Sequence, residues 1–244
     1  MSGLRLVNAI DMVRSLGADP ATATRDSVAN ELSEYVKRKG GKFNYDVPTK
    51  LLKPGFEGAI CEVDAIARCE EHWHKAGRLH CAAALKSVWP HLSANHSTCY
   101  ARSFAAVQVG AVSKRGVFVG SKIPLVRVVA RQSLLVVPMF RRGHRLAGKQ
   151  IDFYLSYLRA QALREGYPNI DIEYLDSLPV GEAGRVLQVS RASERNSYTL
   201  DFIDDRLDVY VKAVAFLFNQ GVGDKPPMFT GYRVLSDDEP SLPL

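Results

Sequence analysis

The stretch at residues 123–140, IPLVRVVARQSLLVVPMF, decides the fold of this chain. It contains two runs rich in Val, Ile and Leu, at 123–131 and 134–140, joined by a short polar segment. Branched apolar residues favour extended structure, so this pattern predicts an antiparallel hairpin. In the first run, Arg127 and Arg131 fall on one face and valines on the other, which is typical of a half-buried strand. We therefore expect arginines along the solvent-facing side of a sheet.

The segments around this stretch predict more strands and two long helices. Small, branched and apolar residues bounded by turn signals indicate strands at 103–112, 117–119, 170–175 and 185–189. Apolar residues at spacings of three and four indicate helices at 146–164 and 200–219, each followed by a glycine at which it can end. The second half of the chain is therefore expected to form an antiparallel sheet with two long helices.

The first hundred residues have the pattern of helices. Helices are expected at 4–16, from residue 19 or 24 to before Gly40, at 56–75, and at 79–89 before Pro90, with a connector at 44–54. The first two helices are expected to pack together or to form a DNA-reading helix-turn-helix. The predicted fold class is α+β, with a helical N-terminal region at 1–100, an antiparallel sheet plus helices at 101–220, and an extended acidic, proline-containing tail at 221–244.

The charges of the chain are unevenly distributed. No Asp or Glu occurs between His72 and Ile151, whereas this acid-free stretch holds thirteen of the 32 Lys and Arg residues and all six histidines. The formal net charge of +6 is made up of +13 in this stretch, −1 before it and −6 after it. A strongly basic middle between near-neutral and acidic flanks is typical of proteins that bind nucleic acid or another polyanion.

The second half of the acid-free stretch provides the candidate nucleic-acid contacts. Arg127 and Arg131 come from the strand face, and Arg141, Arg142 and Arg145 form the densest cluster. Guanidinium groups bind phosphate oxygens in pairs, so this cluster is interpreted as a phosphate clamp, although a solvated loop would contain the same residues. The predicted function is sequence-tolerant binding of RNA or DNA within a larger complex. Further contacts are expected from Lys114, Arg115 and Lys149.

The first half of the acid-free stretch raises the question of a metal site. All four cysteines and five histidines lie between residues 61 and 99. Zinc prefers four Cys or His ligands in a tetrahedron, and Cys69 and His72 are spaced to share a helical face. No Cys-x-x-Cys pair is present, so the alternative is that the cysteines are core residues and the histidines extend the basic surface. The remaining zinc ligands would come from His80, Cys81, His96 and Cys99.

Two groups of residues support the alternative that the chain is a nuclease. Asp171 and Glu173 lie two apart on a predicted strand, which resembles the restriction-nuclease arrangement, in which strand carboxylates hold magnesium against a phosphate. The pattern of that family has a lysine two positions after an acidic residue, whereas here Gln188 is followed by Ser190. The second candidate is His144, as a general acid or base in metal-free RNA cleavage.

The composition limits the remaining classes. No apolar run approaches about 18 residues, so no membrane-spanning helix is expected, and the charged N-terminus does not have the pattern of a signal peptide. Four unevenly spaced cysteines favour a reducing cytoplasm over a disulfide framework. No glycine-rich phosphate loop or nucleophile elbow is present in the sequence. A further alternative to nucleic-acid binding is a structural subunit that docks its basic stretch on an acidic partner protein.

Overall fold

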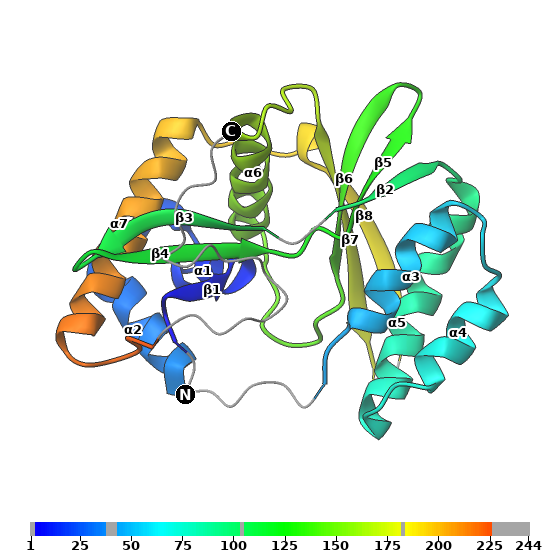
Figure 1. Ribbon diagram of the computed structural model, residues 1–244, viewed down its shortest axis with the longest axis horizontal. Coiled ribbons are helices and arrows are strands. Elements are labelled where there is room, and N and C mark those ends of the chain that lie inside the picture. Colours follow the sequence, from blue (N-terminus) through cyan, green and yellow to red (C-terminus); the bar gives the residue numbers. More distant parts are fainter. Residues whose placement is uncertain (1–2, 38–42, 103–104, 182–183, 226–244) are drawn as a thin grey trace.

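The computed structural model describes residues 3–37, 43–102, 105–181 and 184–225. The described residues form two β-sheets and the helices α1 to α7 (Figure 1). The fold class is α+β, as the sequence predicts. Of the predicted tail, residues 226–244 lie outside the described residues.

A five-stranded sheet in the order β2-β5-β6-β7-β8 lies at the centre of the molecule. The strands β5 and β6 are the antiparallel hairpin predicted at 123–140. Strand β7 is parallel to β6, because helix α6 (Lys149–Arg164) carries the chain back across one face of the sheet. The sheet is therefore mixed and not purely antiparallel as predicted. The strand bounds are β2 (Thr98–Ala101), β5 (Leu125–Val129), β6 (Gln132–Met139), β7 (Asp171–Val180) and β8 (Gly184–Arg191).

A smaller sheet in the order β1-β4-β3 pairs a strand near the N-terminus with a hairpin from the middle of the chain. Strands β3 (Ala105–Val112) and β4 (Arg115–Ser121) form the predicted hairpin, whereas β1 (Leu6–Asn8) corrects the prediction of one helix at 4–16. Strand β1 pairs parallel with β4, with Val7 opposite Val119. Helix α1 (Ala9–Ser15) follows directly, because the Asn8 side chain accepts a 2.9 Å hydrogen bond from the Ile10 amide and caps it.

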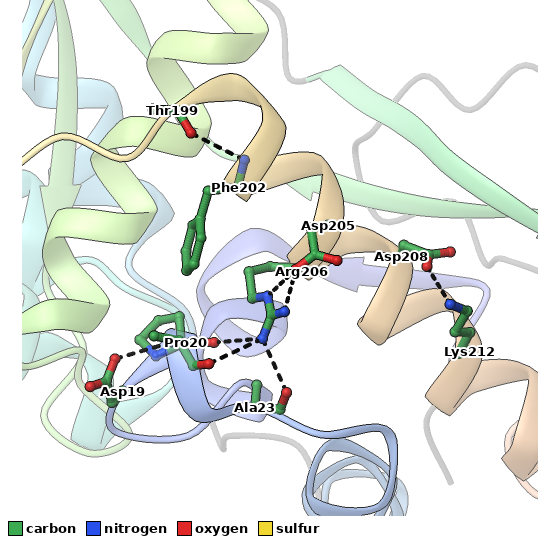
Figure 2. Close-up of polar contacts among 10 residues, drawn as sticks. Asp19, Pro20, Ala23, Thr199, Phe202, Asp205, Arg206, Asp208 and Lys212 are labelled. Carbon is green, nitrogen blue, oxygen red and sulfur yellow. Dashed lines mark hydrogen bonds and ion pairs between the residues drawn. The ribbon is translucent and has the colours of Figure 1, made fainter.

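One face of the central sheet is covered by α6, and beyond it lie the small sheet, α1, α2 (Arg25–Lys37) and α7 (Leu200–Asn219) (Figure 1). Helix α2 buries its apolar face in this core, so it packs as an ordinary core helix. Figure 2 shows how α7 is attached to the N-terminal segment: Arg206 donates hydrogen bonds to the carbonyl oxygens of Pro20 at 3.2 Å and Ala23 at 3.1 Å. These bonds reach carbonyls at the two ends of the 3-10 turn η1 (Pro20–Thr22), where the Pro20 carbonyl also accepts the Ala23 amide at 3.3 Å.

The opposite face of the central sheet is covered by α3 (Asp46–Phe56), α4 (Glu62–Glu70) and α5 (Lys75–Ala94) (Figure 1). Three predictions here were wrong. The expected connector at 44–54 is largely the helix α3, which has Pro48 in its first turn, where no helical donor is lost. The expected helix at 56–75 is instead a turn followed by α4, and α5 continues past Pro90.

Two hydrophobic cores result, one on each face of the central sheet. The first contains Leu135 and Tyr174, and the second contains Val136 and Leu175, as strand alternation requires. Each core includes residues from both sides of residue 100, so the predicted boundary there does not separate two cores. None of the described helices is long and apolar enough to cross a membrane.

Candidate functional site

A cleft of about 780 Å³ lies where β6 ends and the loop 140–148 begins, and we call it the loop cleft. Its walls come from α1 and α2, from the segment 43–49 with His80 of α5, and from residues 138–144. Because β6 and β7 are parallel and joined by α6, the cleft lies at the carboxyl end of a parallel strand, where α/β sheets commonly bind ligands. Two arginines of the predicted basic cluster, Arg141 and Arg142, line the cleft, and so does the candidate catalytic histidine, His144.

The loop cleft has more positive than negative fixed charges. Four basic side chains line it against the two carboxylates Asp11 and Asp46. Asp11 accepts two hydrogen bonds from Arg141, at 2.9 and 3.2 Å, and its Oδ1 is also 3.4 Å from Arg14 Nη1. Burial alone would lower the pKa of Arg141, but the Asp11 carboxylate raises it above its usual value. One carboxylate is thus shared by two guanidinium groups. The four basic residues are Arg14, Lys122, Arg141 and Arg142.

The loop 140–148 is held in place by two arginines that donate to backbone carbonyls. Arg145 donates to the carbonyl of Arg141 at 2.5 Å and to that of Ser177 at 3.2 Å, and it forms an ion pair with Asp176. Arg185 donates to the carbonyl of Phe140 at 2.8 Å. Arg145 is therefore largely occupied inside the protein, with 15% of its side chain exposed, and we assign it to positioning the loop and not to phosphate contact.

Aromatic and imidazole rings form the α3–α5 side of the loop cleft. Phe43 stacks on His80, with ring centroids 5.4 Å apart and an interplanar angle of 15°, and it contacts Tyr45 edge-on at 5.4 Å. Burial and the nearby positive charges of Arg142 and Arg185 lower the pKa of His80 below its usual value. His80 is therefore neutral at pH 7, with burial as the larger cause and the two arginines adding to it.

Arg127, predicted to face solvent, is instead one of the most buried side chains, with 1% of its surface exposed. Its Nε and Nη2 donate to the two carboxylate oxygens of Glu173, at 2.8 and 2.5 Å, and its guanidinium lies over the Phe56 ring at 4.8 Å. The Arg127 face of β5 is the one that packs against the second core, whereas Val126 and Val128 on the other face are only half-buried, so the prediction assigned the two faces the wrong way round. Arg127 cannot contact a phosphate backbone in this structure.

The two hairpin carboxylates proposed to hold magnesium are both buried and both have partners inside the protein. Glu173 binds Arg127, and its Oε1 is 3.5 Å from His91 Nε2. Asp171 accepts a 2.6 Å hydrogen bond from the Ser193 hydroxyl and a 3.2 Å bond from the Ser193 amide. Asp171 therefore fixes the turn after β8, and the restriction-nuclease arrangement has no structural support from these residues.

The three cysteines predicted as zinc ligands lie in the second hydrophobic core. Burial raises the pKa of Cys69 to about 12 and that of Cys81 to about 11, which keeps both thiols protonated. Within the described ranges, no group of three or more His, Cys, Asp or Glu side chains could hold a metal ion. This applies to all six candidate ligands, Cys69, His72, His80, Cys81, His96 and Cys99.

The four remaining predicted contacts lie away from the loop cleft. Lys114 is exposed in the β3–β4 turn, and Arg115 beside it pairs with Asp224. Lys149, at the start of α6, pairs with Asp19, which raises the pKa of the lysine. Arg131 occupies the β5–β6 turn and lines a second cleft. The interface predicted along one sheet face is thus divided among separate surfaces.

The sequence did not identify Arg14, Lys122, Phe43 or Tyr45 as lining residues. Lys122 belongs to the acid-free stretch, so its charge was a usable signal, but the other three come from distant segments that only the fold brings together.

Neither a protein-family model nor a curated protein sequence matches this chain. A solved structure described as "Crystal structure of SSO0001" aligns with 74% of this chain and 81% of that chain, at 8% sequence identity and a TM-score of 0.32. A TM-score this low establishes neither a shared fold nor a shared function, so the site is argued from the chain's own residues.

Proposed function

We propose that this chain binds nucleic acid, RNA or DNA, through phosphate contacts in the loop cleft. The observation that carries the proposal is the gathering of Arg14, Lys122, Arg141 and Arg142 around one concave surface that holds only two carboxylates. A concave surface with excess positive charge concentrates a polyanion and strengthens its contacts. Arg145 and Arg127 are withdrawn from the predicted contacts because both are engaged inside the protein.

The expected contacts are tolerant of sequence. Arg142 is exposed at the rim, and Arg141 is oriented by its two bonds to Asp11, so a guanidinium edge is fixed in direction before a ligand arrives. Phosphate contacts carry no sequence information, and aromatic faces stack on any base. The rings of Phe43 and Tyr45 suit an unpaired strand better than a duplex, whose bases are already stacked.

Fluorescence anisotropy of labelled single-stranded and duplex oligonucleotides across a range of salt concentrations tests this proposal. Binding should weaken steeply with salt, with a slope of roughly 0.7 for each phosphate neutralised on a single strand. The double variant Arg141→Ala/Arg142→Ala should weaken all sequences alike and make this slope shallower. The matched control Arg25→Ala/Lys212→Ala also removes two positive charges, from α2 and α7, outside the cleft.

Unchanged affinity and slope in Arg141→Ala/Arg142→Ala, with binding still present, would place the interface elsewhere. Absence of oligonucleotide binding at low salt would reject the proposal and favour the remaining prediction, docking on an acidic partner protein. The loop cleft would then be examined with acidic peptides by the same anisotropy measurement.

Metal-free RNA cleavage is the second candidate function, because His80 and His144 line the same cleft as the arginines. A neutral imidazole can accept a proton from a ribose hydroxyl, and a protonated one can donate to the leaving oxygen. Incubation of RNA with excess chelator should then give products that His144→Ala does not give. RNA that stays intact over hours with the wild-type chain rules this activity out and leaves binding as the proposed function.

A further inference from the structure

A second cleft, of about 650 Å³, lies at the other end of the five-stranded sheet, beside the β5–β6 turn. We call it the turn cleft. Strand β6 runs from Ser133, which lines the turn cleft, to Met139, which lines the loop cleft. At about 3.3 Å per residue these positions are roughly 20 Å apart, so the two clefts are separate sites.

Two exposed tyrosines line the turn cleft. Tyr100 is 60% exposed on the edge strand β2, where it lies opposite Val126 of β5, and Tyr167 is 52% exposed in the segment that follows α6. Scattered exposed apolar groups are ordinary, but two large aromatic side chains on one concave surface mark a binding site. Both rings present exposed surface to the cleft.

The turn cleft also carries an excess of positive charge. Arg102 lies over the Tyr167 ring at 5.8 Å and pairs with Glu165, while Arg131 adds a second guanidinium at the rim. Two fixed positive charges therefore face one negative charge. The aromatic wall and the excess guanidinium favour a ligand that is both flat and anionic.

The turn that carries Arg131 is unusual in its residues. Ala130 and Arg131 have φ values of +48° and +68°, the left-handed pair of a type I′ hairpin turn. Asn and Gly are favoured at these positions because a β-carbon makes the conformation strained. Ser113 and Lys114 form the same left-handed pair in the β3–β4 turn, so the conformation fixes the place of Arg131 at the mouth of the cleft, and the case for a ligand rests on the rings and charges there.

We propose that the turn cleft binds a nucleotide, either a free mononucleotide or the terminal nucleotide of a strand. Its base would stack against Tyr100 or Tyr167, its ring edge would bind the Asn169 amide and the Ser133 hydroxyl, and its phosphate would face Arg131. The volume lies within the range of about 300–1,000 Å³ that small-molecule sites occupy. This inference is independent of whether the loop cleft binds nucleic acid.

Calorimetric titration of the full chain with adenosine monophosphate, adenosine and inorganic phosphate tests the inference. Adenosine monophosphate should bind most tightly, because only it combines the ring with the anion. Tyr167→Ala should weaken it about fivefold or more, the lower limit for one stacked base. Arg131→Ala should weaken adenosine monophosphate but not adenosine. Trp73→Ala and Lys212→Ala are the controls, since they remove an exposed ring and an exposed charge outside both clefts.

A labelled single strand with a 5′ phosphate distinguishes the two sources of nucleotide. If mononucleotides do not bind but Tyr167→Ala weakens the strand, the ligand is a strand end; if only mononucleotides respond, it is the free nucleotide. The inference is overturned if neither ligand responds to Tyr100→Ala or to Tyr167→Ala, or if inorganic phosphate competes as well as adenosine monophosphate. Arg141→Ala/Arg142→Ala should leave mononucleotide binding unchanged. A failure of the loop-cleft proposal can therefore be told apart from a failure of the turn-cleft inference.

Discussion

Breaking the buried ion pair between Arg127 and Glu173 should strongly destabilise the protein. Both side chains are 1% exposed and are joined by two hydrogen bonds, at 2.8 and 2.5 Å. Arg127→Met keeps most of the aliphatic volume but removes the charge and both hydrogen bonds to the enclosed Glu173 carboxylate, which keeps its 3.5 Å contact with His91 Nε2. We expect the free energy of unfolding to fall by about 3–5 kcal/mol, the cost of leaving a buried charge unpaired.

The companion variants separate the burial of a lone charge from the value of the pair itself. Glu173→Leu should cost a similar amount, because it leaves the guanidinium unpaired. The double variant Arg127→Met/Glu173→Leu should cost less than either single variant, since apolar groups of similar volume replace a buried ion pair at little net loss. The loss of about 3–5 kcal/mol is large against the total of about 5–15 kcal/mol typical of a folded domain.

The ion pair also predicts a dependence of stability on pH. Burial raises the pKa of Glu173, but hydrogen bonds from His91 and Arg127 lower it overall below its usual value of 4.5. A carboxyl group whose pKa is lower in the folded state contributes stability above the unfolded pKa, and loses it as the pH falls through the folded pKa. The wild type should therefore lose stability below about pH 4.5, and Glu173→Gln should lack that part of the loss.

Urea unfolding followed by tryptophan fluorescence measures all of these variants, since Trp89 lies in the core on this side of the sheet. The matched variant Arg127→Lys keeps a charge but not the two-pronged contact, and it should fall between the wild type and Arg127→Met. Arg127→Met within about 1 kcal/mol of the wild type would refute the reasoning. So would a double variant whose cost equals the sum of the two singles, because that result means no coupling.

Three further predictions follow from other parts of the structure. At pH 8 a thiol reagent should modify Cys61 rapidly and the three buried cysteines slowly, because burial raises their pKa values, that of Cys69 to about 12; rapid modification of all four would contradict this packing. Burial and two nearby arginines lower the pKa of His80, so a bound oligonucleotide should raise it in an NMR titration, and an unchanged pKa would place the polyanion elsewhere. Gly110→Ala would place a β-carbon 2.8 Å from Val211 Cγ2 and should cost about 1–3 kcal/mol in thermal unfolding, which Val211→Ala should partly restore.

The local patterns of the sequence predicted the elements but not their surroundings. The hairpin at 123–140 and the helix at 200–219 appear as predicted, because alternation and helical spacing depend on neighbouring residues alone. Alternation along β5 gave two faces without saying which is covered, and the covered one is the face of Arg127. The partner of Arg127 is Glu173, 46 residues away, so no local pattern could have shown that this arginine is neutralised inside the protein.

The acid-free stretch illustrates the same limit for charge. Several of its arginines and lysines have no acidic neighbour in the sequence but pair in space with carboxylates from outside the stretch. Asp11 binds Arg141, Asp19 binds Lys149 and Asp176 binds Arg145. Counting charge along the sequence therefore overestimates the positive charge that a polyanion meets.

The three arginines of the loop 140–148 were interpreted as one clamp, yet their partners give them different roles. Arg145 holds the loop backbone from inside, Arg141 is oriented by Asp11 at the wall of the cleft, and Arg142 is exposed at its rim. Replacing all three together would confuse loss of contact with loss of loop geometry, because Arg145→Ala removes the bonds to the Arg141 and Ser177 carbonyls. The phosphate-binding role belongs to the two arginines that line the cleft, and the third is the reason that they are held there.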